Sequence, residues 1–435
     1  MTIKKLVFLA PQYILFMILS FILLFLFIAL VNTRLAAFIL IILLPSYLLR
    51  FNIGFLPTTF LEVMIIILIF IWFIKKIKNI NLAVSWQKIK DLLGLQNLII
   101  IGLFVISATI AVFIASDTRA AWGAWKAYFI EPIILFFIFL DIFSKRDIPK
   151  ILLSLALSAF LVSALAIIQK FTGWFVPYTF WGKDNTFRVT SFYGYPNAIG
   201  LYLGPIIPLL VFYAAHLTKE FKKNIFLIFF LLLVIIFSLL AIFWANSTGA
   251  IMGLLLGIII TGFFYKKTIF VSILLLLIFS SVIYFNILPS NISDTLLLKD
   301  WSGQVRVKMW TETFEMLKHN FIFGPGLSNY QTAVAPYHIW SFVEIFQYPH
   351  NLILNFWSEI GLLGLFSFLA LVIIFLKKII FTFRQNQNKF LLFGLIWSMF
   401  VILIHGLVDV PYFKNDLAIL FWLIFSLPFL LDKKQ

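Results

Sequence analysis

The sequence contains no cysteine, and this absence excludes disulfide bridges, a thiolate nucleophile and cysteine-based metal sites. Charged residues are scarce as well, at 11% of 435 residues. The polar segments hold no Asp-x-Asp pair for a divalent metal, no Gly-x-x-x-x-Gly-Lys phosphate loop and no dinucleotide fingerprint. The sequence therefore predicts no metal site and no cofactor, and it argues against nucleotide-driven chemistry.

Apolar residues fill the chain instead. Hydrophobic residues make up 63% of the sequence and the mean hydropathy is +1.09, values typical of membrane proteins. Apolar runs of about 17 to 25 residues recur along the chain, and a run of this length can cross a bilayer as a helix. We therefore predict an all-α, polytopic integral membrane protein.

Thirteen apolar runs are candidate spans: residues 8–31, 35–49, 57–74, 97–115, 127–143, 151–169, 197–216, 225–245, 249–265, 268–288, 351–376, 390–410 and 416–431. Thirteen crossings would place Lys4 and Lys5 on the outer side, against the positive-inside rule. We expect about twelve transmembrane helices and a cytoplasmic N-terminus, and the alternative is an external N-terminus. The first run lacks a small-residue cleavage site and is expected to remain in the protein.

Basic residues gather in alternate connections from residue 75 onward, which the positive-inside rule places in the cytoplasm. These residues are Lys75, Lys76, Lys78, Lys145, Arg146, Lys219, Lys222, Lys223, Lys266, Lys267, Lys377, Lys378, Arg384, Lys433 and Lys434. The remaining connections are then extracytoplasmic: 116–126, 170–196, 246–248, 289–350 and 411–415. Orientation in a lipid membrane explains the net charge of +16 more simply than nucleic-acid binding does.

We divide the chain into three parts. Residues 1–288 form transmembrane helices with an aromatic outer loop at 170–196, residues 289–350 form one long extracytoplasmic loop, and residues 351–435 form the C-terminal transmembrane helices. Within the long loop, apolar residues recur near helical spacing and end at a Gly-Pro-Gly sequence. They are Val305, Trp310, Phe314, Leu317 and Phe321. This pattern predicts an amphipathic helix that lies on the outer leaflet or caps the spans.

The outer loop at 170–196 combines many aromatic rings with Arg188, which precedes the helix that opens at Tyr195-Pro196-Asn197. Most of these rings suit an interfacial aromatic belt, and the alternative is a platform for sugar rings. A guanidinium beside a helix N-terminus suits a phosphate group, although a lipid headgroup would fit equally well. Arg306, four residues before Trp310, is a second candidate that could also be an ordinary surface arginine. Arg119 is a weaker third.

His350 is the most informative residue, because it begins an apolar helix at the predicted outer surface and because a histidine side chain can act as a general base. Asn351 follows it directly, and Glu359 lies nine residues further on inside the apolar run. A carboxyl group in a span is costly unless it is paired or functional. A second histidine, His405, precedes Asp409 by four residues, so the two could form a hydrogen bond with either a structural or a functional role.

Four motifs in this order resemble the O-antigen ligase superfamily, which includes lipopolysaccharide O-antigen ligases, polysaccharide polymerases and bacterial O-oligosaccharyltransferases. They are FRVTSFYGYPNAIG, the NSTGA turn, RVKMWTETFEMLKHNFIFGPGLSNYQ and the His-Asn-x9-Gly-x-x-Gly signature in HNLILNFWSEIGLLG. The motifs cover roughly residues 180–365, and the span pattern covers the whole chain. Two features depart from the family: many members have an arginine after the serine of NSTGA, and the outer loop contains no recognisable domain for docking a protein acceptor.

The resemblance implies a GT-C-like enzyme of the bacterial cytoplasmic (inner) membrane. It would transfer a glycan from undecaprenyl pyrophosphate to a hydroxyl of a glycan, lipid or protein acceptor at the extracytoplasmic face. By the same resemblance, His350 would be the base or the acceptor-positioning group, and two arginines would hold the pyrophosphate. The predicted substrate-binding residues are Arg188, Arg306, Asn197, Asn351, Tyr195, Trp310 and Glu359.

Two other functions compete with a ligase. A polymerase of the same superfamily would share the spans, the outer loop and the arginines, and the His-Asn signature favours the ligase. A transporter for a lipid-linked glycan would predict charged residues deep in several spans and internal repeats. The clearest deep charges are only Glu62, Glu131 and Glu359, and no repeat is visible. The transporter is therefore the weakest of the three hypotheses.

Overall fold

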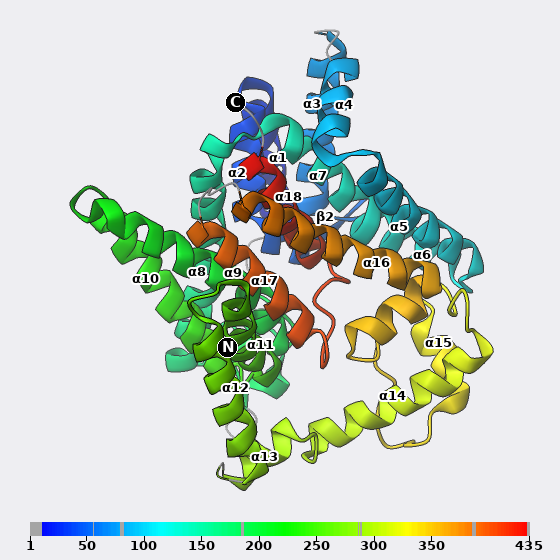
Figure 1. Ribbon diagram of the computed structural model, residues 1–435. Coiled ribbons are helices and arrows are strands. Elements are labelled where there is room, and N and C mark those ends of the chain that lie inside the picture. Colours follow the sequence, from blue (N-terminus) through cyan, green and yellow to red (C-terminus); the bar gives the residue numbers. More distant parts are fainter. Residues whose placement is uncertain are drawn as a thin grey trace.

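The computed structural model describes residues 11–54, 56–78, 82–183, 187–285, 287, 289–384 and 389–432, and helices dominate it (Figure 1). Lys4 and Lys5 lie outside the described residues. The first half contains α1 (Pro11–Val31), α2 (Thr33–Ile42), α3 (Phe60–Lys78), α4 (Leu82–Leu93), α5 (Leu95–Ile114), α6 (Thr118–Trp125), α7 (Glu131–Ile142) and α8 (Ile148–Thr172). The second half contains α9 (Asn197–Leu217), α10 (Phe221–Trp244), α11 (Thr248–Thr261), α12 (Ile269–Tyr284), α13 (Ser290–Leu296), α14 (Trp301–His319), α15 (Tyr330–Val334), α16 (Leu352–Arg384), α17 (Lys389–His405) and α18 (Asn415–Asp432).

A short β-hairpin interrupts the helices, so the chain is not strictly all-α. Strands β1 (Arg50–Ile53) and β2 (Leu56–Thr59) pair antiparallel, with Arg50 opposite Thr59 and Ile53 opposite Leu56. Sequence analysis placed the two flanking spans at 35–49 and 57–74 and left this connection unassigned. The hairpin occupies the connection and extends into the start of the expected second span.

Six helical segments of the described chain are long and apolar enough to cross a membrane, judged by length and composition. They are Leu95–Ile114, Thr118–Ile142, Lys145–Thr172, Asn197–Trp244, Leu352–Arg384 and Asn415–Asp432. The segment Asn197–Trp244 contains both α9 and α10. Shorter apolar helices accompany these six, among them α2, α12 and α17. The chain is a multi-pass membrane protein, but the expected count of about twelve spans is not confirmed.

The contacts of Lys75 relate the direction of the first helix to that of α3. Lys75, near the end of α3, donates to the carbonyls of Ala29 and Leu30 at 3.1 and 2.6 Å and to the hydroxyl of Thr33 at 3.0 Å. The end of α1 therefore lies beside the end of α3. If the Lys75 end of α3 is cytoplasmic, as its basic residues predict, α1 begins on the opposite side of the membrane. This geometry favours an external start over the expected cytoplasmic one.

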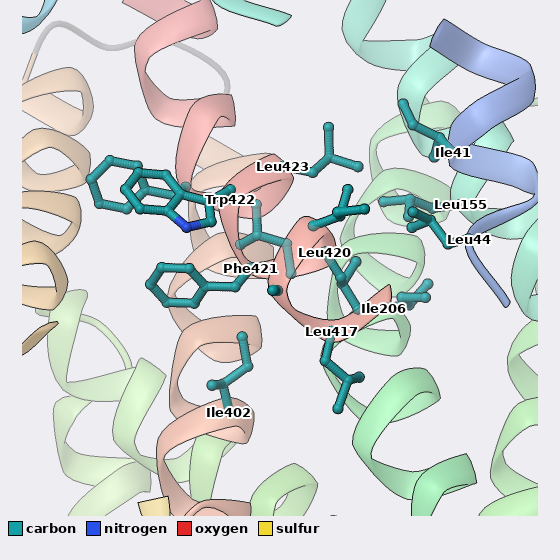
Figure 2. Packing of buried hydrophobic residues seen from close by; sticks show 14 of the residues in the cluster. Ile41, Leu44, Leu155, Ile206, Ile402, Leu417, Leu420, Phe421, Trp422 and Leu423 are labelled. Carbon is teal, nitrogen blue, oxygen red and sulfur yellow. The ribbon is translucent and has the colours of Figure 1, made fainter. Parts of the chain in front are cut away.

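The helix α18 forms the centre of the molecule, and nearly all of its side chains are buried. Figure 2 shows its leucine and aromatic side chains pointing in several directions, toward residues of α2, α8, α9 and α17. A helix that is apolar on all faces is stable only when other helices surround it. The indole N–H of Trp422 donates to the Tyr412 hydroxyl at 3.0 Å, and that hydroxyl donates to the Tyr128 carbonyl at 2.8 Å.

Glycines spaced four residues apart allow α11 and α17 to pack closely. A Cβ atom added to Gly253 would lie 3.1 Å from the Val401 carbonyl oxygen, and one added to Gly249 would lie 3.0 Å from Nε2 of His405. Small residues at this spacing let two helix backbones approach each other within a membrane. Close packing is therefore one role of the glycine in the NSTGA turn.

The outer segment (residues 289–350) carries α13, α14 and α15 along one side of the bundle and returns to it at α16 (Figure 1). The predicted amphipathic helix is present as α14. Its buried positions include Val305, Met309, Glu312, Thr313, Met316 and Leu317. Of the predicted apolar positions, Phe314 and Phe321 are exposed instead, 50% and 57% respectively. The helix is tied to the bundle by Arg306, which bonds to the Val408 carbonyl between α17 and α18, and to the end of the outer segment by Trp310, which bonds to the Pro349 carbonyl.

A break in α16 anchors the middle of the outer segment. Gly361 has a φ of +69°, and the backbone N–H of the next residue donates to the Ile322 carbonyl at 2.9 Å instead of continuing the helix. Glu359 accepts a hydrogen bond from the backbone N–H of Ser328 at 2.6 Å. The glycine of the His-Asn-x9-Gly-x-x-Gly signature is thus required by backbone conformation and by close approach.

Replacing Gly361 with alanine should destabilise the protein. The backbone of Gly361, with φ +69° and ψ −175°, lies in a region that essentially only glycine adopts, at a cost to other residues of about 1–3 kcal/mol. The new Cβ would also lie 2.6 Å from the Ile322 carbonyl oxygen. Thermal denaturation in detergent should show a clearly lower midpoint for Gly361→Ala. Gly102→Ala is the matched control, because its helical site leaves open space around the added methyl group. Equal midpoints for the two variants would contradict the role assigned to the break in α16.

Candidate active site

His350 lies at the junction between the outer segment and α16. Its φ of +47° falls in the left-handed region, which non-glycine residues rarely adopt. On one side, Trp310 of α14 donates its indole N–H to the Pro349 carbonyl at 3.0 Å. On the other, Asn351 caps the first turn of α16 with its side-chain oxygen and donates its amide to the Leu407 carbonyl at 3.0 Å. The backbone around His350 is therefore held by contacts with α14, with the first turn of α16 and with the turn that follows α17.

A chain of side-chain contacts leads from His350 across the site. Its Nδ1 lies 3.2 Å from one carboxylate oxygen of Asp409, in the turn between α17 and α18. The other oxygen of Asp409 accepts from the Asn197 amide at 3.2 Å, at the start of α9. The Asn197 side-chain oxygen in turn accepts from the Arg188 guanidinium at 3.0 Å. Four residues from three distant parts of the sequence thus form one connected polar group.

Asp409 is ionised and orients the histidine. Burial by itself would raise the pKa of this carboxyl group, but the neighbouring His350, with His405 and Arg306, holds the pKa well below its ordinary value. A carboxylate that accepts the N–H on Nδ1 leaves Nε2 as the free acceptor. Nε2 of His350 makes no hydrogen bond within the described part of the chain, and His350 lines the cavity described below. The histidine is oriented to take up a proton there.

Arg188 is built into the site by its backbone neighbours. Its guanidinium donates to the carbonyls of Ala245 and Asn246 at 2.8 and 3.0 Å and lies 5.3 Å from the centre of the Trp181 ring. Burial, together with the positive charge of Arg306, lowers the pKa of Arg188 to about 10. The side chain remains protonated at neutral pH. An anion beside these two guanidinium groups would relieve their mutual repulsion.

Arg306 approaches the same region from α14. Its Nε donates to the Val408 carbonyl at 3.0 Å, next to Asp409, and another nitrogen donates to the Ser302 hydroxyl at 2.7 Å. The remaining nitrogen of Arg306 and one nitrogen of Arg188 have no hydrogen-bond partner among the described residues. Both arginines therefore keep a donor for a ligand.

An open cavity of about 830 Å³ unites these groups. Its lining residues are Tyr178, Trp181, Arg188, Tyr195, Pro196, Asn197, Trp301, Ser302, Val305, Arg306, Met309, Gln331, Phe342, Val343, Glu344, Ile345, Phe346, Gln347, Tyr348 and His350. Cationic side chains and His350 share this space with aromatic rings. Such a mixture suits a ligand that has an anionic group and a large polar-apolar body.

Two tyrosines line the cavity beside His350, and a lysine packs on the ring of one of them. The Tyr348 hydroxyl donates to the Tyr195 hydroxyl at 3.3 Å, and the Tyr348 ring lies 4.9 Å from the His350 ring. The Lys414 ammonium lies 3.8 Å from the centre of the Tyr195 ring. Burial lowers the pKa of Lys414 to about 8, despite the opposing effect of Asp416.

The structure brings five of the eight predicted site residues together and sets three apart. His350, Arg188, Arg306, Asn197 and Tyr195 line the cavity. The other three do not line it, and each has a structural contact instead. Trp310 holds the Pro349 carbonyl, Asn351 caps α16, and Glu359 binds the backbone of Ser328. Their predicted contacts with substrate remain predictions.

The expected hydrogen bond between the side chains of His405 and Asp409 is absent, and the two residues are joined only by the backbone N–H of Asp409, which donates to the His405 carbonyl at 3.0 Å. The Asp409 carboxylate turns to His350 and Asn197, and Nδ1 of His405 is buried without a hydrogen-bond partner among the described residues. Sequence reasoning missed Asp409 as the partner of His350 because 59 residues separate them. It also missed Tyr348. Within the described ranges, no group of three or more histidine, aspartate or glutamate side chains is placed to hold a metal ion.

Residues 231–369, from α10 to the part of α16 beyond its break, match the family model described as O-antigen ligase. This segment contains the NSTGA turn, Arg306, Trp310, His350 and the glycine break at Gly361. Arg188, Asn197 and Asp409 lie outside it. A comparison with curated protein sequences gives no match.

Replacing Lys414 with methionine should raise the stability of the protein at neutral pH. The folded-state pKa of about 8 lies below the ordinary value of 10.5, so folding disfavours the charged form. The wild type should gain stability as the pH rises above about 8, because its lysine then loses the proton. The advantage of Lys414→Met in thermal denaturation should therefore shrink at alkaline pH.

Lys170→Met is the matched control for this experiment. Lys170 also lies over an aromatic ring, Phe187, at 5.3 Å, but its side chain is exposed. Its replacement should leave the midpoint nearly unchanged at every pH. A lower midpoint for Lys414→Met at neutral pH would show that the ammonium stabilises the fold.

Proposed function

Through residues 231–369 the chain belongs to the O-antigen ligase superfamily, and from this premise we propose the reaction of its outer cavity. The family indicates a membrane glycosyltransferase of the ligase or polymerase type. We propose that the donor is a glycan on undecaprenyl pyrophosphate and that the acceptor is a hydroxyl group. The transfer would take place at the extracytoplasmic face of the bacterial cytoplasmic membrane.

The connected group His350–Asp409–Asn197–Arg188 is the observation that carries the proposal. It joins an oriented histidine to an arginine within one cavity, and a second arginine lines the same space. An acceptor hydroxyl must lose a proton as it attacks, and a departing pyrophosphate must have its charge balanced. The cavity contains groups suited to both tasks.

In the proposed step, the acceptor oxygen bonds to the anomeric carbon of the donor sugar. The bond from that carbon to the pyrophosphate oxygen breaks, and the lipid pyrophosphate leaves with the electron pair. Nε2 of His350 accepts the hydroxyl proton, and the carboxylate of Asp409 stabilises the imidazolium that forms. Arg188 and Arg306 hold the pyrophosphate oxygens. A single displacement from the opposite face inverts the anomeric centre, which NMR of the product linkage would reveal.

Two alternatives remain distinct from this proposal. A polymerase of the same superfamily would use a second lipid-linked glycan as the acceptor. A transporter would require charged residues deep within the spans, and these residues would exchange their partners during transport. Here Glu62 forms an ion pair with Lys126, and Glu359 binds a backbone N–H, so both carboxyl groups have structural roles. These two groups support an enzyme over a transporter, whereas both carboxylate oxygens of Glu131, the third deep charge, are buried without a hydrogen-bond partner among the described residues.

Replacing His350 with alanine should lower the rate of glycan transfer about 100- to 10,000-fold, the usual contribution of a positioned base. Asp409→Asn should lower the rate as well, because the amide cannot stabilise the imidazolium. The measurement is transfer of a labelled glycan from undecaprenyl pyrophosphate in proteoliposomes. His319→Ala is the control, since His319 is exposed and does not line the cavity. Near-normal transfer by folded His350→Ala protein would refute the assigned role of His350.

Mass spectrometry of the products separates the ligase from the polymerase. We expect a ligase to release free undecaprenyl pyrophosphate and to place the glycan on an acceptor that carries no such lipid. Products that grow by whole repeat units while still attached to the lipid would support the polymerase. Labelled lipid that changes leaflet with no new glycosidic bond would support the transporter.

A further inference from the structure

Three aromatic rings of the outer segment lie together at the cavity. The ring centres of Trp301 and Trp340 are 5.8 Å apart, those of Trp301 and Phe342 are 6.1 Å apart, and those of Trp340 and Phe342 are 5.7 Å apart. The angles between the ring planes are only 10°, 26° and 20° in the same order. We call these three residues the aromatic platform.

The platform is exposed even though it is apolar. Trp301 is 60% exposed and Phe342 is 72% exposed, and both line the cavity that contains His350. Exposed aromatic groups that cluster at a cavity usually mark a binding surface. The rings belong to two separate parts of the outer segment, so folding assembles the platform.

Buried polar contacts hold the platform in place. The buried carboxylate of Glu312 lies 3.1 Å from Nδ1 of His338 and accepts the backbone N–H of Ile339 at 3.0 Å. Nε2 of His338 lies 2.9 Å from the Val343 carbonyl oxygen. Trp340 and Phe342 lie between these two anchors. On the other side, Asp300 caps α14 and accepts from the Gly303 backbone at 3.1 Å, which fixes the first turn with Trp301. The rings are therefore ordered before any ligand binds.

Polar side chains accompany the rings along the same wall. Gln331, Glu344 and Gln347 line the cavity together with Trp301 and Phe342. Aromatic faces pack against the C–H faces of pyranose rings, while carboxylate and amide groups bond the hydroxyls at the ring edge. A lipid acyl chain would gain nothing from these polar groups. The composition of this wall thus matches a carbohydrate.

The position of the platform indicates that its ligand is the donor glycan. Trp301 precedes Arg306 by five residues on α14, an axial separation of about 7.5 Å, and Ser302 next to Trp301 bonds directly to Arg306. A sugar chain that starts at a pyrophosphate on Arg306 reaches the platform within a few linked rings. Resting on the proposed function, we propose that the aromatic platform binds a pyranose ring of the donor glycan, beyond its pyrophosphate-linked sugar.

Two kinetic constants test the platform in the full-length protein. One is the KM for the native undecaprenyl-pyrophosphate glycan, extracted from membranes of source cells that lack this chain. The other is the Ki of undecaprenyl pyrophosphate without sugar, which reports on the arginines alone. Trp301→Ala and Phe342→Ala should raise the KM about tenfold or more and leave both kcat and Ki nearly unchanged. Trp301→Phe should recover much of the lost affinity, because it retains an aromatic face.

Trp174→Ala is the matched control, because Trp174 is 58% exposed in the aromatic outer loop and does not line the cavity. It should keep the wild-type KM. Three results overturn the platform: an unchanged KM in both platform variants, a Ki that rises with the KM, or an equal effect of Trp174→Ala. A rise confined to the KM of the acceptor would also overturn the assignment to the donor. Failure of the proposed function looks different, since the wild type would then form no glycosidic bond.

Discussion

The contact between His350 and Asp409 is the constraint on which the arrangement of the candidate active site depends. Asp409 is 1% exposed, and a buried carboxylate is tolerated only where partners compensate for its lost hydration. Its partners come from the start of α16, the start of α9 and its own turn before α18. The carboxylate therefore fixes three parts of the molecule relative to one another. The same contact determines which nitrogen of His350 faces the cavity.

The outer segment depends on a second constraint, at the backbone of α16. The left-handed Gly361 breaks the helix where the backbone of residues 322–324 approaches it, and Glu359 holds the following turn through Ser328. The signature His-Asn-x9-Gly-x-x-Gly thus combines two kinds of requirement. His350 serves the cavity, whereas Asn351, Glu359 and Gly361 position the chain that leads to it.

The surface of the cavity that contains His350 has a cationic region and an aromatic region. Arg188 and Arg306 place positive charge near His350, and Trp301 and Phe342 place aromatic faces further along α14 and its neighbouring loop. Charge attracts an anion over a distance but distinguishes ligands poorly, while aromatic contacts depend on the shape of the surface they meet. A lipid-linked glycan has both kinds of group at a fixed separation. The donor that we propose would therefore contact both regions at once.

The sequence by itself determined the membrane class, and it pointed to the amphipathic helix α14 and to five candidate site residues that the structure places around one cavity: His350, Arg188, Arg306, Asn197 and Tyr195. These follow from local patterns: hydropathy, helical spacing and motifs that need no distant partner. The tertiary structure decided that Asp409 belongs to His350 and not to His405, because that pairing joins residues 59 apart and depends on how α16 and α17 end. It also decided that Glu359 anchors a loop, and that Trp301 meets Trp340 and Phe342. Contacts of this kind depend on the relative positions of helices, which hydropathy and spacing along a single chain do not specify.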